Sequence, residues 1–348
     1  MSRLIDIRLR AQQLVVPQFD DPAELIRWMG MVQAQEYGSA KWAIALRLRT
    51  PAAAGVEEAL RDGRILRMHI MRPTWHFIAA EDVRWMLRLS ARRIRAANAS
   101  FANGNGCGLE EADYLRCNRL LERLLEGGNC LTRQQIADEL GRAGMAVDAP
   151  RLNRLMMRAE TDGVVCSGAD RAEKPTYALL AERAPQAADL PEEEALALLA
   201  RRYFRSHAPA TFEDFVWWSG LTVGEARRGI GALGTELLRE SFDGREYLLH
   251  EGCAACEAAP VQAHLLPAFD EYLIGYKDRT DVLAYAYRER AFNAYGTFRP
   301  VVLHNGRIVG RWGRKGTQVD VEPFAGEKQP SARLLRSAEG RWKLFREG

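Results

Sequence analysis

Apolar residues recur at helical spacing in the first part of the chain. Asp21-Pro22 joins a capping aspartate to a proline at the first helical position, so the pattern predicts a helix that begins near residue 22. A second helical run covers residues 55–61. The segment Ile65–Ile78 is rich in β-forming residues on both sides of Arg72-Pro73 and predicts a β-hairpin. Helix, helix and hairpin in this order are typical of a winged helix-turn-helix unit.

The same order returns between residues 111 and 181. Thr132 is a capping residue, and Gly141 and Gly144 mark the end of the helix that it starts. A polar loop separates the two strands and has the character of a wing. The elements that we expect are helices over Ala112–Leu125, from Thr132 to about Ala143 and over Ala149–Thr161, then strands over Val164–Ser167 and Thr176–Leu180.

A third unit begins after the Pro- and Ala-rich connector at residues 184–191. Asp243-Gly244 is a strong hairpin signal between two apolar stretches. Trp217 and Trp218 have the spacing of helical core residues and are predicted to pack inside. We expect helices over Glu192–Arg205, from Thr211 to Trp218 and from Thr222, and paired strands over Leu237–Ser241 and Tyr247–His250.

Strand patterns dominate from Val261 onward. Val301–Leu303 and Arg307–Trp312 flank Asn305-Gly306, which predicts a hairpin with a type I′ turn, and Gln318–Val321 is a further strand candidate. The sequence therefore predicts an α+β fold of three tandem winged helix-turn-helix modules with a β-rich C-terminal part. We expect the modules at residues 1–105, 106–185 and 186–255 and the C-terminal part at 256–348.

Charge is unevenly placed along the 348 residues. The formal net charge is only +3, yet residues 61–100 and 299–348 each carry six more basic than acidic residues. The remainder is net acidic. One such cluster is explained by a basic surface exposed to solvent. Two clusters, together with winged modules, favour nucleic-acid binding instead. Three different modules in one chain further suggest an asymmetric monomer rather than a symmetric dimer.

Several protein classes are disfavoured by composition. With 47% hydrophobic and 27% charged residues, the chain has the material for packed cores. Neither a signal peptide nor a stretch of about 20 apolar residues is found, so we expect a soluble, cytoplasmic protein that does not act at membranes. The six cysteines are too sparse for a disulfide framework.

Separated motifs resemble one known family. Gln33-Ala34-Gln35, Arg72-Pro73-Thr74-Trp75-His76, the block Leu265–Tyr272 and Tyr276–Arg279 are similar, in this order, to those of the AlkZ/AlkX-type winged-helix DNA glycosylases. The resemblance implies three tandem winged-helix modules with a β-rich C-terminal part. It also implies excision of bulky N7-alkylated purines from double-stranded DNA and unhooking of interstrand crosslinks, with Gln33 and Gln35 as the catalytic pair and no cofactor or metal.

The chemistry of the pair can be considered separately. An amide is no base at neutral pH, but it can orient a water molecule, which suffices where the leaving base already carries positive charge. Residues two apart point to opposite sides of a helix, so the helix from residue 22 must break near Val32 if Gln33 and Gln35 share one water. Glu36 is either a source of negative charge or, as we favour, a surface acid.

Other residues complete the hypothesis. Asp270-Glu271 and Lys277-Asp278-Arg279 are expected to form structural ion pairs. Trp75 and His76 are expected to form core and cap contacts at the hairpin rather than to contact a base, and the hairpin as a whole is a candidate to border the lesion site. The predicted DNA-binding residues are Arg72, Thr74, His76, Arg307, Arg311, Arg314 and Lys315.

The sequence leaves open a possible zinc site and two functions other than catalysis. His250, Cys253, Cys256 and His264 have the chemistry of a zinc site but not a common spacing, and we expect no metal there. A regulator that only binds DNA, or a protein that sequesters a planar DNA-damaging drug, would share the winged modules. Release of a base from alkylated duplex separates the enzyme from both.

Overall fold

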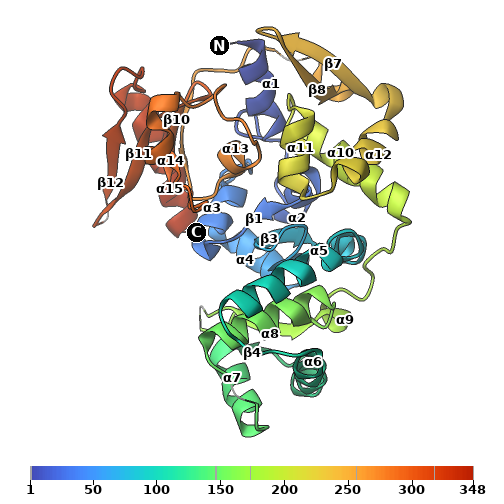
Figure 1. Ribbon diagram of the computed structural model, residues 1–348. Coiled ribbons are helices and arrows are strands. Elements are labelled where there is room, and N and C mark those ends of the chain that lie inside the picture. Colours follow the sequence, from blue (N-terminus) through green and yellow to red (C-terminus); the bar gives the residue numbers. More distant parts are fainter. Residues whose placement is uncertain (1, 146, 173, 256, 317, 348) are drawn as a thin grey trace. The chain divides into compact units, whose positions relative to one another are not determined.

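The computed structural model describes residues 2–145, 147–172, 174–255, 257–316 and 318–347. The chain divides into two compact units, one formed by Met1–Glu57 with Leu196–Gly348 and the other by Glu58–Ala195. Both units combine helices with antiparallel strands, so the protein belongs to the mixed α and β class (Figure 1). In the described part of the chain, no helix combines the length and the apolar character needed to cross a bilayer.

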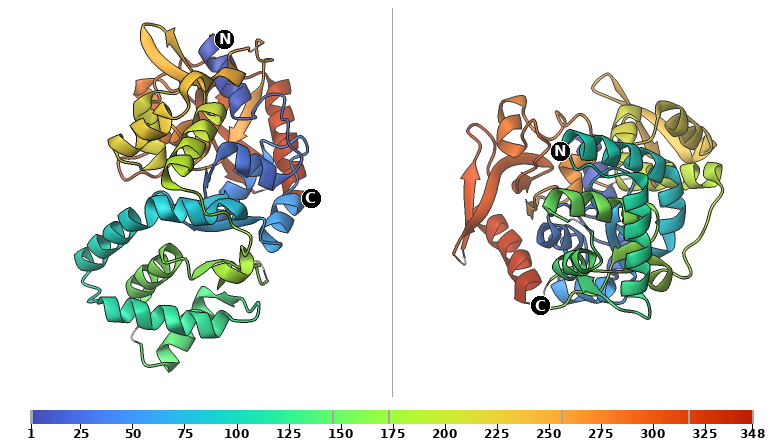
Figure 2. Two further views of the ribbon diagram at one scale, coloured as in Figure 1. Left: turned by 90° about the vertical axis from the view of Figure 1, so that its right-hand side faces the viewer. Right: turned by 60° about the horizontal axis from the view of Figure 1, so that its bottom comes forward.

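The central unit, Glu58–Ala195, is built on a helical core. Helix α8 packs against α5 and α6 (Figure 2). Its core is made of aliphatic and aromatic side chains from α6, α7 and α8, with Val165 and Tyr177 from the sheet. Its elements are β2 (Ile65–His69), β3 (Trp75–Ala79), η1 (Ala80–Asp82), α5 (Val83–Gly104), α6 (Glu111–Leu125), β4 (Leu131–Thr132), α7 (Arg133–Arg142), α8 (Ala149–Thr161), β5 (Val165–Ser167), β6 (Thr176–Leu179) and α9 (Leu180–Arg183).

The terminal unit, Met1–Glu57 with Leu196–Gly348, carries a four-stranded antiparallel sheet in the order β12-β11-β10-β9 and a separate β7-β8 pair. Helix α15 packs against β9 and α3, and Trp342 lies 5.2 Å from Trp42 and 5.3 Å from Trp312 between ring centres. Helices α4 (Ala53–Arg61) and α10 (Glu192–Ser206) cross the boundaries between the units. The remaining elements are α1 (Arg3–Ala11), α2 (Pro22–Met29), β1 (Val32–Gln33), α3 (Tyr37–Ala45), α11 (Phe212–Ser219), α12 (Val223–Gly231), η2 (Gly234–Glu236), β7 (Leu237–Phe242), β8 (Arg245–His250), η3 (Glu251–Cys253), β9 (Ala263–Leu266), α13 (Glu271–Ile274), η4 (Tyr285–Tyr287), α14 (Arg288–Ala291), β10 (Val301–His304), β11 (Arg307–Lys315), β12 (Gln318–Pro323) and α15 (Ala332–Glu347).

Most elements expected from the sequence are present. Helix α2 begins at Pro22, with the Asp21 carboxylate accepting from the Ala23 N–H, as the capping pattern predicts. Among the described residues, the sequence patterns did not predict several helices: the long ones α1, α5 (22 residues) and the C-terminal α15, and the shorter α3, α9, α13 and α14. From Val261 onward, where the sequence predicts a strand pattern, the chain also forms helices α13, α14 and α15. The division into three winged-helix modules stays a prediction, because the two compact units follow different boundaries.

The β10–β11 turn has the geometry that its sequence predicts. Asn305 and Gly306 both have positive φ, at 50° and 76°, as a type I′ turn requires. A Cβ at Gly306 would overlap Cγ2 of Ile5 and lie 3.2 Å from the Tyr272 hydroxyl, which itself donates to the Gly306 carbonyl. Glycine is therefore required here for the close approach as well as for the turn.

Candidate active site

Gln33 and Gln35 lie in a break between two helices. Helix α2 ends at Met29, where Gly30 adopts a φ of 82° and donates to the Ile26 carbonyl at 2.8 Å. The two-residue strand β1 follows and ends at Gln33, and α3 begins only at Tyr37. The predicted break of the helix near Val32 is confirmed, and extended backbone replaces it.

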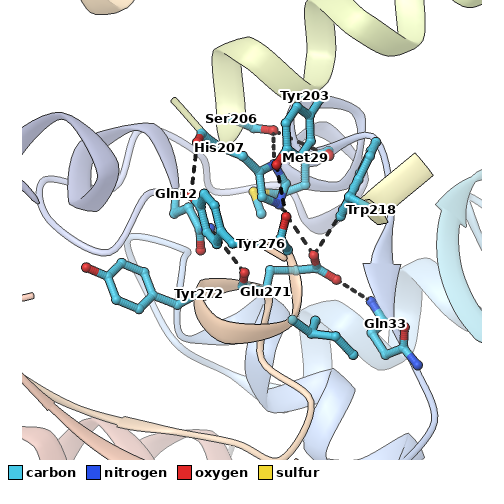
Figure 3. A network of polar contacts seen from close by, with 12 residues as sticks. Gln12, Met29, Gln33, Tyr203, Ser206, His207, Trp218, Glu271, Tyr272 and Tyr276 are labelled. Atoms are coloured by element: carbon cyan, nitrogen blue, oxygen red, sulfur yellow. Dashed lines mark hydrogen bonds and ion pairs between the residues drawn. The ribbon is translucent and has the colours of Figure 1, made fainter. Parts of the chain in front are cut away.

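The two glutamines differ in exposure. Gln33 is buried, with 3% of its surface exposed, whereas Gln35 is exposed. The backbone N–H of Gln33 donates to Oε1 of Glu271 at 2.7 Å, and its side chain extends away from that carboxylate (Figure 3). Strand β1 is thus tied to the buried core through its backbone, and Gln35 follows just beyond the tie.

Glu271 is a fully buried carboxylate at the start of α13. Its Oε2 accepts from the Trp218 indole N–H at 3.1 Å and lies 3.4 Å from Nε2 of His207 (Figure 3). Together with the Gln33 N–H, these groups surround both oxygens of the carboxylate. A buried carboxylate is stable only when such donors face it, so the arrangement couples β1, α11 and α13.

His207 is buried beside this carboxylate and stacks on Tyr203, with ring centres 4.8 Å apart. Burial lowers the pKa of His207 below the ordinary 6.5, and the hydrogen bond to Glu271 opposes this shift only in part. Its Nδ1 lies 2.8 Å from the Ser206 hydroxyl. The ring is therefore neutral at neutral pH, and the network holds a carboxylate next to an uncharged imidazole.

Asp270, the neighbour of Glu271, forms the ion pair that the sequence predicts. Both of its oxygens accept from the Arg47 guanidinium at 2.8 Å, and the two side chains are 1% exposed. Asp278 likewise pairs with Arg245 at 2.7 Å. Glu271 contacts the Gln33 N–H, the Trp218 indole and His207.

The β2–β3 hairpin of the central unit carries Arg72, Thr74 and His76. His76 is fully buried, with Nδ1 2.9 Å from the Thr74 carbonyl and Nε2 3.1 Å from Arg72 Nη2. Burial, aided by the Arg72 charge, holds the pKa of His76 well below its usual range. This burial fits the expectation that His76 packs at the hairpin, and DNA contact by these three residues stays a prediction.

The four basic residues predicted on the C-terminal hairpin all lie on β11. Arg311 donates from Nε to Glu322 at 3.0 Å, and Arg307 lies 3.5 Å from Glu327. Arg314 and Lys315 are exposed at the end of the strand. Two of the four cations therefore have acidic neighbours, whereas Arg314 and Lys315 form the exposed basic tip.

The residues weighed as zinc ligands do not gather into a metal site where they are described. Cys256 lies outside the described residues. His250 accepts from the Gly252 N–H at 3.1 Å, and His264 is buried in β9. No group of three or more candidate ligands occurs among the residues that the structure describes.

Comparison with known proteins gives one family. Its model, described as DNA glycosylase AlkZ-like, matches residues 26–342. The interstrand DNA cross-link repair glycosylase of Streptomyces sahachiroi is 28% identical over 307 residues, which are 84% of this chain and 82% of that protein. The solved structure of Streptomyces sahachiroi DNA glycosylase AlkZ matches with a TM-score of 0.80 at 24% identity, covering 97% of this chain and 94% of that one. The resemblance seen in the sequence motifs is confirmed, and the chain belongs to the AlkZ-like DNA glycosylase family.

Proposed function

We propose that this protein is a monofunctional DNA glycosylase that hydrolyses the N-glycosidic bond of bulky N7-alkylated purines and unhooks interstrand crosslinks. Membership in the AlkZ-like family and the similarity to the interstrand DNA cross-link repair glycosylase of Streptomyces sahachiroi support this assignment. The observation that carries it is the Gln33–Glu271 tie, which fixes the backbone of the glutamine motif to a buried carboxylate. The enzyme acts on double-stranded DNA as a monomer and without a cofactor.

The reaction follows from what an amide can do. Gln33 and Gln35 accept hydrogen bonds from one water and aim it at the anomeric carbon, but neither amide removes a proton before attack. The leaving base must therefore depart without help. An N7-alkylguanine does so because it already carries positive charge, which breaking the glycosidic bond neutralises. Uracil would leave as an anion and is not a substrate.

DNA is held by the winged modules. We assign three tandem winged-helix modules to the chain, with Arg72, Thr74 and His76 on one hairpin and Arg307, Arg311, Arg314 and Lys315 on another as the DNA-binding residues. Arginine suits phosphate because its guanidinium donates two parallel hydrogen bonds. A crosslink leaves little room for a closed pocket, so attack proceeds from an open cleft.

An excision assay tests the proposal. Duplexes that contain one N7-methylguanine, one nitrogen-mustard crosslink or one uracil are incubated with wild type, Gln35→Ala and the matched surface variant Glu36→Gln. We expect base release from the first two duplexes only, a loss of at least about 100-fold in Gln35→Ala and unchanged release by Glu36→Gln. Binding without release by wild type would instead favour the regulator or the drug-sequestering protein, and equal release by Gln35→Ala would refute the catalytic role.

A further inference from the structure

A pocket of about 670 Å³ lies in the terminal unit, away from the glutamine motif in sequence. It is lined from α11, the start of β8, the segment after α13, and α14. This volume is in the range of sites that hold small organic ligands. None of the predicted catalytic or DNA-binding residues lines it.

The pocket is lined by both cationic and aromatic side chains. Arg245, Lys277, Arg279 and Arg288 face Glu213 and Asp278, which leaves an excess of two positive charges. Arg245 and Asp278 neutralise each other in an ion pair of 2.7 Å. Arg279 forms part of the floor, because its Nε donates to the Leu273 carbonyl at 2.7 Å. Lys277 and Arg288 are exposed and form the cationic part of the rim.

The aromatic residues of the pocket fall into two groups. The guanidinium of Arg279 lies 4.8 Å from the ring centre of Phe292, 5.0 Å from that of Phe298 and 5.7 Å from that of Trp217, so Arg279 occupies one face of each of these rings. Tyr285 is 76% exposed and Trp217 is 43% exposed, although core packing was predicted for Trp217. The indole N–H of Trp217 donates to the Ile274 carbonyl at 3.1 Å, which fixes its ring as a rigid surface.

We propose that this pocket binds one unpaired nucleotide, with the base stacked on Tyr285 and Trp217 and the phosphate held by Lys277 and Arg288. Exposed aromatic rings beside cations are the means by which proteins bind unpaired nucleotides without reading sequence. The proposal rests on the proposed action on DNA, and it makes the pocket the place for a nucleotide displaced from the duplex.

The test measures binding rather than excision. Wild type, Tyr285→Ala, Tyr285→Phe and Tyr295→Ala are titrated by fluorescence anisotropy with three undamaged duplexes: fully paired, with one bulged nucleotide, and with one bulged abasic residue. Tyr295 is the matched control, because it is 95% exposed on the same segment but does not line the pocket. Free dGMP as competitor distinguishes a mononucleotide from a nucleotide in a strand.

We expect wild type to bind the bulged nucleotide about tenfold more tightly than the abasic bulge, as stacking of one base allows. Tyr285→Ala should lose this preference, whereas Tyr285→Phe and Tyr295→Ala should keep it. Lys277→Gln should reduce the salt dependence of log K by about one unit of slope. If dGMP displaces the bulged duplex at concentrations near its own Kd, the pocket binds free nucleotides. If dGMP does not displace it, the pocket binds a nucleotide within a strand.

The inference is overturned if wild type shows no preference for the bulged nucleotide or if Tyr285→Ala retains it. Because these duplexes carry no alkylated base, the result does not depend on catalysis. A protein that prefers the bulge but releases no N7-methylguanine would refute the proposed function alone. A protein that releases the base but shows no bulge preference would refute the pocket alone.

Discussion

Replacing Glu271 by glutamine tests whether the buried carboxylate holds the glutamine motif in place. In the native protein Oε1 accepts from the Gln33 N–H at 2.7 Å, and Oε2 accepts from the Trp218 indole N–H at 3.1 Å. A glutamine amide keeps one oxygen and turns its NH2 group toward the other donor. Glu271→Gln therefore leaves one buried N–H facing another donor, in whichever orientation the amide adopts.

The loss of stability follows from this one unsatisfied donor. One orphaned buried donor and the loss of charge from the other hydrogen bond together lower the free energy of unfolding by about 2–4 kcal/mol. We expect a larger effect on excision than on substrate binding, because β1 loses its fixed position while the proposed DNA-binding residues are unchanged. Urea unfolding with an unchanged m-value measures the first effect, and single-turnover release of N7-methylguanine at saturating protein measures the second.

Glu36→Gln is the control, because Glu36 is an exposed carboxylate beside the same strand that accepts from Ser39 Oγ at 3.1 Å. Its substitution should change stability by less than about 0.5 kcal/mol. The reasoning is refuted if Glu271→Gln unfolds at the same urea concentration as Glu36→Gln. If Glu271→Gln is destabilised but excises at the wild-type rate, Glu271 stabilises the fold without positioning the motif.

Three further predictions concern the core of the same unit. Asp270→Asn leaves Arg47 buried without its anion and should cost about 3–5 kcal/mol in urea unfolding, whereas a joint apolar replacement of both should recover most of this. Burial lowers the pKa of His264 to about 3, so the stability carried by its neutral ring is complete above pH 6.5 and is lost as pH falls. At pH 5 this loss is about 2 kcal/mol, and His264→Leu should remove it from the measured pH profile. Gly306→Ala should lower the thermal midpoint well beyond Gly244→Ala, because both turn glycines have positive φ but only Gly306 lies against Ile5.

Local signals explain which elements the sequence predicts well. Helix α8 has the predicted bounds, Ala149–Thr161, because Asp148 caps it at Arg151 N–H and its apolar face is regular. The break before Gln33 is also local, since it depends on Gly30 and on the extended residues that follow. Helix α5 was missed because its arginines were considered only as charge, although apolar residues recur through the same segment.

The contacts of the candidate site are not local. Glu271 is 238 positions from Gln33 and 53 from Trp218, and no periodicity links residues so far apart. The block that contains Glu271 resembled the family, but adjacent Asp270 and Glu271 are both carboxylates, and the sequence does not tell their roles apart. Tertiary packing brings the Arg47 guanidinium to Asp270 and the Gln33 N–H to Glu271, so the difference between the two carboxylates becomes visible only in the structure.

If the proposed function holds, the protonation state of His207 bears on the choice of substrate. His207 contacts Glu271 and has an ordinary pKa near neutrality, but burial lowers this pKa, so the ring is not protonated at pH 7 and has no acidic proton to give. Gln33 and Gln35 are amides and supply none either. A base that needs protonation to leave, such as uracil, gains nothing from these residues, whereas an N7-alkylated purine brings its positive charge with it. Under the proposed function, these residues would therefore favour leaving groups that are already activated.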